Sequence, residues 1–240
     1  MNRYAIYPSL LDSYNWMMAA DDEAAYIQRR QELLDKINRL PHETSYAAAR
    51  GTALNELVDD FIGTPVDKEL RMLTDANGEQ YMVNTVDGFE CGFACDLIRR
   101  IGERLEGAVP QMFFEAEIET EHGVVRLYGY PDYICGDVVT DLKTTSTYAP
   151  GKFRDHWQHL VYSYGLVRGG YVEKVTEFNY LVAELQARKD GVLDGEVYNE
   201  QYAIDVDECE RVLRRFLDYS FLPFVEQNRE LITDNKIFGL

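Results

Sequence analysis

The first part of the chain has the hydrophobic spacing of amphipathic helices. From Leu10 to Leu40, apolar residues recur mostly at three- and four-residue steps, and Pro41 ends this pattern. A second helix is predicted from Ser45 to Ile62, because Gly63 and Pro65 follow it as a C-terminal glycine and a helix breaker. The N-terminal part is therefore predicted to be helical.

The middle of the chain changes character. A polar, turn-rich segment from Pro65 to Gly88 predicts short strands or loop, and a third helix is predicted from Cys91 to Leu105. Three segments rich in β-branched and aromatic residues then predict a three-stranded meander: Phe113 to Thr120, Val124 to Ile134 and Val138 to Leu142.

The remaining pattern alternates again between helix and strand. The predicted elements are a helix from Lys152 to Val167, strands from Val175 to Leu185 and from Val197 to Val206, and a helical region from Asp207 to Phe216. The last region can extend to Ile232 with a break at Pro223, and Asp207 and Glu210 fit a capping box at its start.

Composition is that of an ordinary globular protein. Of 240 residues, 46% are hydrophobic and 28% are charged, which excludes intrinsic disorder and a collagen-like chain. No repeat, linker or low-complexity tract is visible. We therefore predict one α/β domain over residues 1–240, with a helical N-terminal part (1–107), a sheet core (108–206) and C-terminal helices (207–240).

The charge balance narrows the classes of partner. Asp and Glu number 42 and Lys and Arg 24, a net charge of −18, which argues against a protein that coats nucleic acid or an anionic membrane with its whole surface. It does not exclude a local basic groove. With no apolar run near 18 residues we expect no membrane partner and a cytoplasmic location, and the 4 scattered cysteines are expected to be reduced.

The segment from Tyr128 to Thr145 holds the candidate chemistry. A turn at Gly136-Asp137 would pair Cys135 with Val138, and the same register places Asp132 opposite Asp141. Facing residues on paired strands have Cβ atoms about 4.5–5.5 Å apart, so two carboxylates would converge on one point.

Lys143 shares a strand face with Asp141, because side chains alternate along a strand. Two carboxylates suit Mg²⁺, with Mn²⁺ as a substitute, and the lysine could orient a water or stabilise charge on a phosphate. The alternative is a bend and a solvated salt bridge. The apolar neighbours Val138, Val139 and Leu142 favour the first interpretation, since burying charges costs several kcal/mol unless they are paired or bind metal.

Other residues could complete such a site. Glu115 and Glu117 alternate on one face of a predicted strand, and either could supply a third oxygen ligand or lie on a solvent-facing edge. Gln158 and Tyr162 are four residues apart on a predicted helix and share a face, where they could bind phosphate or nucleotide; Tyr162 could instead be a core residue.

Taken together, these motifs resemble a known family. Gly-x-Pro-Asp at Gly129 to Asp132, Thr-Asp-Leu-Lys-Thr-Thr at Thr140 to Thr145, and Gln-x-x-x-Tyr at Gln158 to Tyr162 resemble the PD-(D/E)xK nucleases of the RecB-like, phage-type exonuclease branch. Two further stretches, from Tyr7 to Tyr14 and from Arg50 to Leu57, resemble the Ser-Pro-Ser opening and the helical Gly-x-x-x-His motif of that branch. The resemblance implies a restriction-endonuclease-like core, with a central mixed β-sheet flanked by helices.

The resemblance also implies roles for individual residues. Asp132 and Asp141 would bind the metal, Lys143 would act on the attacking water, and Gln158 and Tyr162 would hold the DNA or the lysine region. The family usually has a metal-binding His where this chain has Asn55, so Asn55 or the adjacent Glu56 would take that place. Arg50, at the start of the helical motif, is expected to contact DNA.

A DNA substrate needs a cationic path. Lys152 and Arg154 are the best-placed candidates, because they lead into the helix that carries Gln158; the arginines in 99–104 and 211–215 are more typical of solvated helix faces. No P-loop is present, so processivity would require a homo-oligomeric ring or a separate helicase or recombination partner.

The sequence thus predicts a Mg²⁺-dependent DNA exonuclease of phage-type recombination or DNA repair. Two alternatives stay open on the same fold. One is a catalytically silent DNA-binding or scaffold protein, in which Asn55 marks lost chemistry. The other is an endonuclease, which would cut closed circular DNA.

Overall fold

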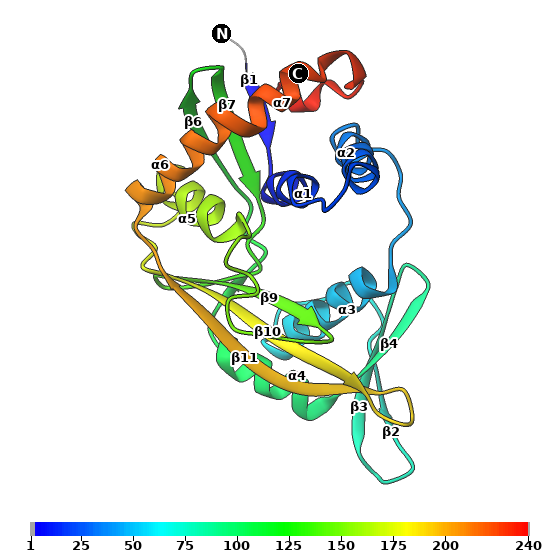
Figure 1. The fold of residues 1–240 in the computed structure, drawn as a ribbon. Coiled ribbons are helices and arrows are strands. Elements are labelled where there is room, and N and C mark those ends of the chain that lie inside the picture. The colour runs from blue at the N-terminus through cyan, green and yellow to red at the C-terminus, as the bar shows by residue number, and fades with distance from the viewer. Residues whose placement is uncertain (1–2, 240) are drawn as a thin grey trace.

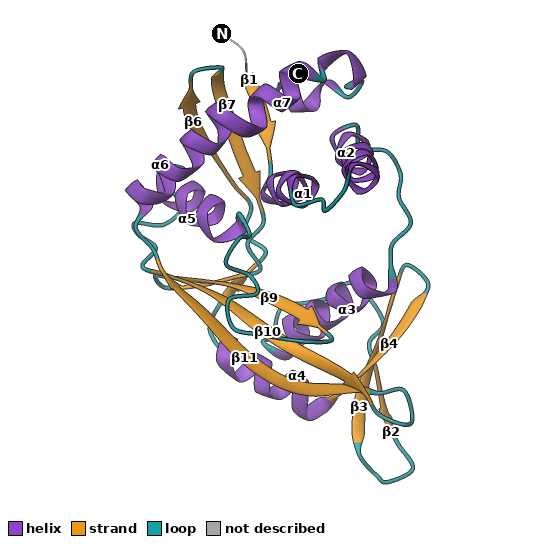
Figure 2. Ribbon diagram, in the orientation of Figure 1, coloured by secondary structure: helices purple, strands orange, loops and turns teal. Residues whose placement is uncertain are grey.

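The computed structural model describes residues 3–239, whose strands form two separate sheets (Figures 1 and 2). The large sheet has the strand order β2-β3-β4-β11-β10-β9-β8-β5, and the small sheet has the order β1-β7-β6. The strands of the large sheet are β2 (Arg71–Thr74), β3 (Gln80–Val86), β4 (Phe89–Ala94), β5 (Val109–Pro110), β8 (Tyr133–Cys135), β9 (Val138–Thr145), β10 (Glu177–Ala187) and β11 (Leu193–Ala203). Those of the small sheet are β1 (Arg3–Ile6), β6 (Phe114–Thr120) and β7 (Gly123–Gly129).

The large sheet is mixed. β9 runs parallel to β10, β10 pairs antiparallel with β11, and β8 pairs antiparallel with β9. Strands β9 and β10 are also the most central apolar strands, so the polar residues they carry stand out from a buried background. The predicted fold class, a central mixed sheet flanked by helices, is confirmed.

Different sets of helices cover the two sheets (Figure 1). The α-helices are α1 (Pro8–Met18), α2 (Glu23–Ile37), α3 (Tyr46–Phe61), α4 (Cys95–Gly102), α5 (Gln158–Arg168), α6 (Val206–Phe216) and α7 (Leu222–Gln227). Helices α3 and α4 pack on the large sheet around one apolar cluster, whereas α1, α5 and α6 pack around a second cluster with the small sheet. Helix α5 contacts both β6 and β10, so its N-terminus lies where the two sheets meet.

Short helical turns join these elements. Turns of 3₁₀ helix occupy η1 (Glu103–Leu105), η3 (Arg229–Leu231) and η4 (Asn235–Phe238), and a π-helical turn, η2 (Leu217–Phe221), links α6 to α7. In the described part of the chain, no helix combines the length and the apolar character needed to cross a membrane.

The predicted meander is wrong in its middle strand. The segment from Val124 to Ile134 is divided between two sheets: β7 ends at Gly129 and β8 begins at Tyr133. Pro131 lies between them, and a proline cannot donate a ladder hydrogen bond. Gly129 has a positional role as well, because a Cβ there would lie 2.9 Å from the Tyr162 ring. This crossover carries Asp132 from one sheet to the other.

Several predicted helix boundaries also differ. The stretch from Leu10 to Leu40 is two helices, because Asp22 caps α2 by accepting a hydrogen bond from Ala25 N at 2.8 Å. Cys91 lies in β4 rather than in a helix, and α4 starts at Cys95.

Two differences concern the C-terminal half. Helix α5 starts at Gln158 rather than at Lys152, because residues 149–156 form turns. The N-cap of α6 is Asp205, not Asp207, since its side chain accepts hydrogen bonds from the Asp207 and Glu208 amides. Pro223 lies in the first turn of α7, where its missing N–H costs nothing, so it does not break the region.

Candidate active site

The hairpin of β8 and β9 brings Asp132 beside Asp141. Cys135 pairs with Val138 and Tyr133 with Thr140, which is the predicted register. Asp132 directly precedes Tyr133, and its Oδ2 accepts a hydrogen bond of 2.9 Å from Leu142 N. Asp141 is only 2% exposed. The chain has thus placed two carboxyl groups at one end of a buried hairpin.

Lys143 and Gln158 close a cluster around Asp141. Lys143 Nζ lies 2.6 Å from Asp141 Oδ2 and donates a hydrogen bond of 2.6 Å to Gln158 Oε1. Gln158 Nε2 in turn donates to Asp141 Oδ1 at 2.8 Å. The amide is fixed in its orientation, because one end accepts from a cation and the other donates to an anion.

The charges in this cluster shift one another's proton affinities. Burial and the neighbouring charge of Asp141 raise the pKa of Asp132 to about 7. For Lys143, burial alone would lower the pKa, but the charges of Asp141 and Asp132 outweigh it and raise the pKa. The lysine is therefore an ammonium, and its positive charge offsets part of the negative charge of the two acids.

Tyr162 lies one turn further along α5 and has two roles. Its ring packs edge-on against Phe114, with centroids 5.7 Å apart, so it is partly a core residue. Its hydroxyl also interacts with the Gln158 side chain, and burial followed by the charge of Asp141 raises its pKa. Tyr162 therefore combines a core position with a contact to Gln158, and its binding of phosphate or nucleotide stays a prediction.

The oxygen atoms of the cluster suit a hard divalent cation. Asp141 Oδ2 approaches Lys143 outside hydrogen-bonding geometry, and it has no hydrogen-bond partner in the described chain. Asn55, on α3, hydrogen-bonds Asp132, and its own Oδ1 is buried without a partner among residues 3–239. Asp141 Oδ2 is paired only with Lys143, and a buried amide oxygen without a partner, such as Asn55 Oδ1, is costly; carboxylate and amide oxygens are the ligands that Mg²⁺ and Mn²⁺ take. The residues present fit such an ion.

Three acidic candidates are not brought to this cluster. Glu56 is held elsewhere, because it binds Lys68 Nζ at 2.7 Å and Asn84 Nδ2 at 2.7 Å. Glu115 and Glu117 lie on β6 in the small sheet. Glu115 is 3.6 Å from Arg126 and Glu117 is 3.7 Å from Arg3, with side chains 50% and 56% exposed. Glu115 and Glu117 therefore lie on a solvent-facing acidic edge, which was the alternative to a role as metal ligands.

The structure therefore offers two carboxylates and one amide oxygen as side-chain ligands. Within residues 3–239, no set of three or more His, Cys, Asp and Glu residues is close enough to hold a metal ion. A cation such as Mg²⁺ keeps several water ligands, so two carboxylates with an amide oxygen are sufficient.

The predicted DNA-contact residues flank the cluster. Lys152 lies in the turns before α5 and donates to Thr145 Oγ1 at 2.5 Å and Thr147 O at 2.6 Å. Arg154 is exposed in the same turns. Arg50 is next to Gly51, whose Cβ position would be 3.5 Å from Thr144 Oγ1, and Arg50 Nε has no hydrogen-bond partner in the described residues. Arg50 thus lies near the end of β9 with donor capacity to spare.

Asp12 lies beside the cluster although the sequence did not reveal it, and it is close to His156. Asp12, on α1, accepts a hydrogen bond of 2.8 Å from Trp157 N, and its Oδ2 lies 3.7 Å from His156 Nδ1. The charge of Asp12 also acts on Lys143. The only signal for Asp12 was its position within the stretch from Tyr7 to Tyr14, whereas the sequence allowed His156, two residues before Gln158, either near the site or as a surface or packing residue.

Comparison with known proteins identifies the family. The sequence model of the PD-(D/E)XK nuclease superfamily matches residues 24–228, which include the whole cluster around Asp141 except Asp12. No curated protein matches the chain. A solved structure titled "Crystal structure of SSO0001" is 16% identical, with a TM-score of 0.33, and the match covers 51% of this chain and 57% of that chain. The chain spans little more than half the length of that relative.

The matched range contains Asp132, Asp141 and Lys143, which the structure places in one cluster. With 24–228 covering most of the 240 residues, the chain belongs to the PD-(D/E)XK nuclease superfamily.

Proposed function

We propose that this protein is a Mg²⁺-dependent DNA exonuclease that acts in phage-type recombination or DNA repair. The observation that carries the proposal is the contact of Lys143 Nζ with both Asp141 and Gln158, each at 2.6 Å, beside a second buried carboxyl group. A nuclease needs a fixed cationic donor and carboxylate oxygens at one point, and a second buried carboxyl group, Asp132, lies beside the ion pair of Lys143 and Asp141.

Asp132, Asp141 and the amide oxygen of Asn55 would hold the divalent cation. When bound, the cation supplies positive charge that polarises a phosphodiester and lowers the pKa of water. Asp132 must lose its proton to act as a ligand, which a pKa of about 7 allows near neutral pH.

Lys143 would place its ammonium against the reacting phosphate. Gln158 keeps Nζ on the Asp141 side of the cluster, so a donor points at the position where negative charge develops. The same ammonium can orient a water molecule by hydrogen bonding, because it has three donors and Gln158 and Asp141 engage two of them.

The exonuclease assignment rests on the RecB-like motif order and on the charge of the chain. A net charge of −18 disfavours wrapping of DNA and favours a strand end that enters a narrow cationic path past Lys152, Arg154 and Arg50. Processive digestion would need a homo-oligomeric ring or a separate helicase partner. A cytoplasmic location and a single folded domain stay predictions.

The test uses three DNA forms of one sequence: linear duplex, linear single strand and closed circular duplex. Each is incubated with the protein in Mg²⁺, in Mn²⁺ or in EDTA. We expect linear DNA to be degraded from its ends only when metal is present, and closed circles to survive. Asp141→Asn should abolish degradation, whereas the matched control Glu117→Gln, an exposed acid on the small sheet, should not.

Two outcomes would contradict the proposal. Cutting of closed circles would identify an endonuclease. Binding of DNA without any metal-dependent cleavage would support the catalytically silent alternative, in which Asn55 replaces a ligand that the chemistry requires.

A further inference from the structure

A groove of about 610 Å³ lies beside the active site, between α1, the end of α2 and the turns that precede α5. It is lined by polar and aromatic side chains from all three segments: Ser9, Asp12, Ser13, Asn15, Trp16, Ala19, Lys36, Lys152, Asp155 and His156. Small-ligand sites generally occupy about 300–1,000 Å³, so the groove is large enough for one nucleotide unit.

The groove opens onto the catalytic cluster through Asp12 and His156. Both residues line it, and Asp12 Oδ1 accepts a hydrogen bond of 2.8 Å from Trp157 N, the residue directly before Gln158. A strand whose phosphate reaches Lys143 therefore has its neighbouring nucleotide at the groove.

Trp16 is a preformed stacking surface in this groove. Its side chain is 57% exposed, which is unusual for a tryptophan. The Arg29 guanidinium lies 3.6 Å from the ring centroid and also donates to Trp16 O at 2.8 Å, so the indole is held in place. Base stacking on an aromatic ring contributes about 1–3 kcal/mol per base.

Two ammonium groups can receive a phosphate. Lys36 Nζ donates to Ser9 O at 2.8 Å and Ser13 Oγ at 2.9 Å, and Lys152 also has two acceptors. An ammonium has three donors, so one N–H of each lysine is left over within the described contacts. Asp12 accepts a hydrogen bond from Trp157 N, which limits its repulsion of an anion.

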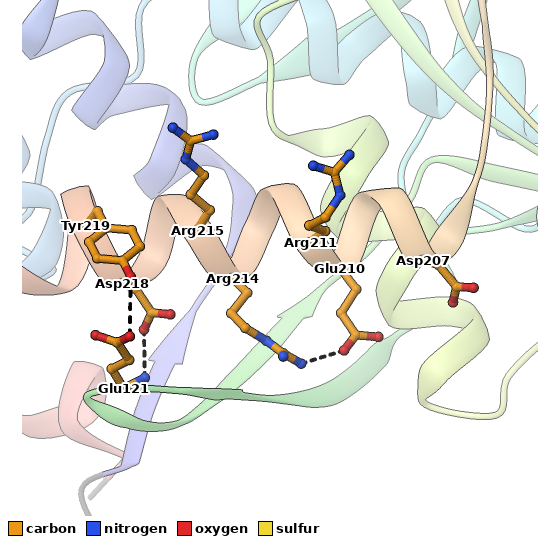
Figure 3. A pocket seen from close by; sticks show the side chains of 8 residues that line it. All are labelled: Glu121, Asp207, Glu210, Arg211, Arg214, Arg215, Asp218 and Tyr219. Carbon is orange, nitrogen blue, oxygen red and sulfur yellow. Dashed lines mark hydrogen bonds and ion pairs between the residues drawn. The ribbon is translucent and has the colours of Figure 1, made fainter.

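A second hollow does not have these properties. It has a volume of about 600 Å³ and lies along α6 and the β6–β7 turn (Figure 3). Its arginines are largely matched by acids, with Arg214 bound to Glu210 and Arg211 to Glu208, and Asp218 accepts from Glu121 N. This surface is an ionic network rather than an anion site.

We infer that the groove binds one nucleotide unit next to the scissile phosphate, with its base stacked on Trp16 and its phosphate between Lys36 and Lys152. The inference rests on the proposed function, because a nuclease supplies the ligand. The nucleotide can belong to the uncut strand or to the released product, and the test separates these sources.

The binding experiment uses intrinsic fluorescence in the Asp141→Asn background, which prevents cleavage. The chain has 2 tryptophans, and the other, Trp157, is 8% exposed and stacked on Phe216. We expect an eight-nucleotide oligo-dT to quench the emission of Trp16, and an abasic oligomer of equal length to quench it several-fold less. Trp16→Phe should remove this quenching. If the oligomer quenches Trp16 more strongly than dTMP does, the nucleotide belongs to the uncut strand. If both quench equally, the site binds the released product nucleotide. Both results support a nucleotide site.

The kinetic experiment uses the otherwise unaltered chain. Trp16→Ala should raise KM for linear DNA about tenfold, consistent with loss of about 1.4 kcal/mol of stacking, and should change kcat less than threefold. Trp16→Phe should restore most of the loss. Met18→Ala is the matched control, since Met18 is also on α1 and 57% exposed but does not line the groove.

Specific results would overturn the inference. Equal quenching by intact and abasic oligomers, or equal KM effects of Trp16→Ala and Met18→Ala, would show that no base stacks on Trp16. Failure of the unaltered chain to degrade DNA would count against the proposed function alone, because the fluorescence measurement does not depend on cleavage.

Discussion

Gln158 Nε2 donates a hydrogen bond of 2.8 Å to Asp141 Oδ1, so a neutral amide on α5 shares the acid that also pairs with Lys143 on β9. The helix and the strand are thereby joined at the catalytic cluster itself. The amide orients both charged groups, and its removal should affect activity more than stability.

Replacing Gln158 tests this positioning role. We expect Gln158→Ala to lower kcat about 10–100-fold, and Lys143→Ala to lower it about 10²–10⁴-fold, because in the proposed function only the lysine would touch the reacting groups. The measurement is single-turnover cleavage of linear DNA in Mg²⁺. Gln186→Ala, an exposed glutamine at the end of β10, is the control. Activity of Gln158→Ala equal to that of the control would argue against the role.

Lys143 should also affect folding. Asp141 is 2% exposed, so Lys143→Ala leaves a buried carboxylate without its cation and should lower the free energy of unfolding by about 3–5 kcal/mol in metal-free buffer. The double variant Asp141→Asn with Lys143→Met should recover most of that loss. Urea unfolding provides both values. Equal instability of the single and double variants would show that the charge is not the cause.

Metal affinity should depend on pH. Burial and Asp141 raise the pKa of Asp132 to about 7, and a cation must displace that proton. We expect the affinity for Mn²⁺ to rise by up to about tenfold per pH unit below pH 7 and to level off above it. Calorimetry in two buffers of different ionisation enthalpy should detect about one proton released at pH 6 and fewer at pH 8. Affinity that is constant from pH 6 to 8 would contradict this.

The raised pKa of Asp132 also determines how the stability of the metal-free protein depends on pH. A carboxyl group whose pKa is raised in the folded state stabilises the fold below the unfolded value near 4, and that contribution is lost as the pH rises through about 7. Asp132→Asn removes the charge. The metal-free variant should therefore be more stable than the parent chain at pH 8, and the difference should shrink toward pH 5.

The sequence predicted the catalytic hairpin because its geometry is local. Cys135 and Val138 flank a two-residue turn, and alternation along a strand then relates Asp132, Asp141 and Lys143 without further information. Gln158 followed from its four-residue spacing to Tyr162 on a helix that the residue pattern predicted. These residues lie within about 27 positions of one another, so local rules suffice.

The rest depended on contacts between distant segments. Nothing local showed that β6 would join the small sheet, so Glu115 and Glu117 stayed ligand candidates until the crossover at Pro131 separated them from Asp132. Asp12 is 131 positions from Lys143 and reaches it only through the packing of α1 on α5. Periodicity cannot reveal such pairs.

Glu200 should control the loop that carries Lys152. This buried residue on β11 accepts hydrogen bonds from Gly151 N at 3.1 Å and Phe153 N at 3.1 Å, and from the hydroxyls of Tyr148 and Tyr202. Burial would raise its pKa, but these bonds outweigh burial and lower it.

Removal of that acceptor leaves four donors unpaired. Glu200→Ala should therefore cost about 2–4 kcal/mol of stability and raise KM for DNA by displacing Lys152. Glu200→Gln keeps one acceptor oxygen and should recover part of both effects. Thermal unfolding and steady-state kinetics measure them. A KM unchanged in Glu200→Ala would mean that the loop keeps its position without this residue.

His159 should make the fold sensitive to acid. Burial, followed by the charge of His156, lowers the pKa of His159 to about 4, and its ring stacks on Tyr202 with centroids 5.1 Å apart. Because the folded-state pKa lies below the unfolded value of about 6.5, the stability of the neutral ring is fully present above pH 6.5 and is lost as the pH falls toward 4. The loss should be about 2 kcal/mol, and His159→Phe should remove it while keeping the stack.

Denaturant unfolding from pH 7 to 4.5 measures how stability falls with pH, with His42→Phe, an exposed loop position, as the control. If the parent chain and His159→Phe lose stability in parallel over this range, another group is responsible for the acid sensitivity.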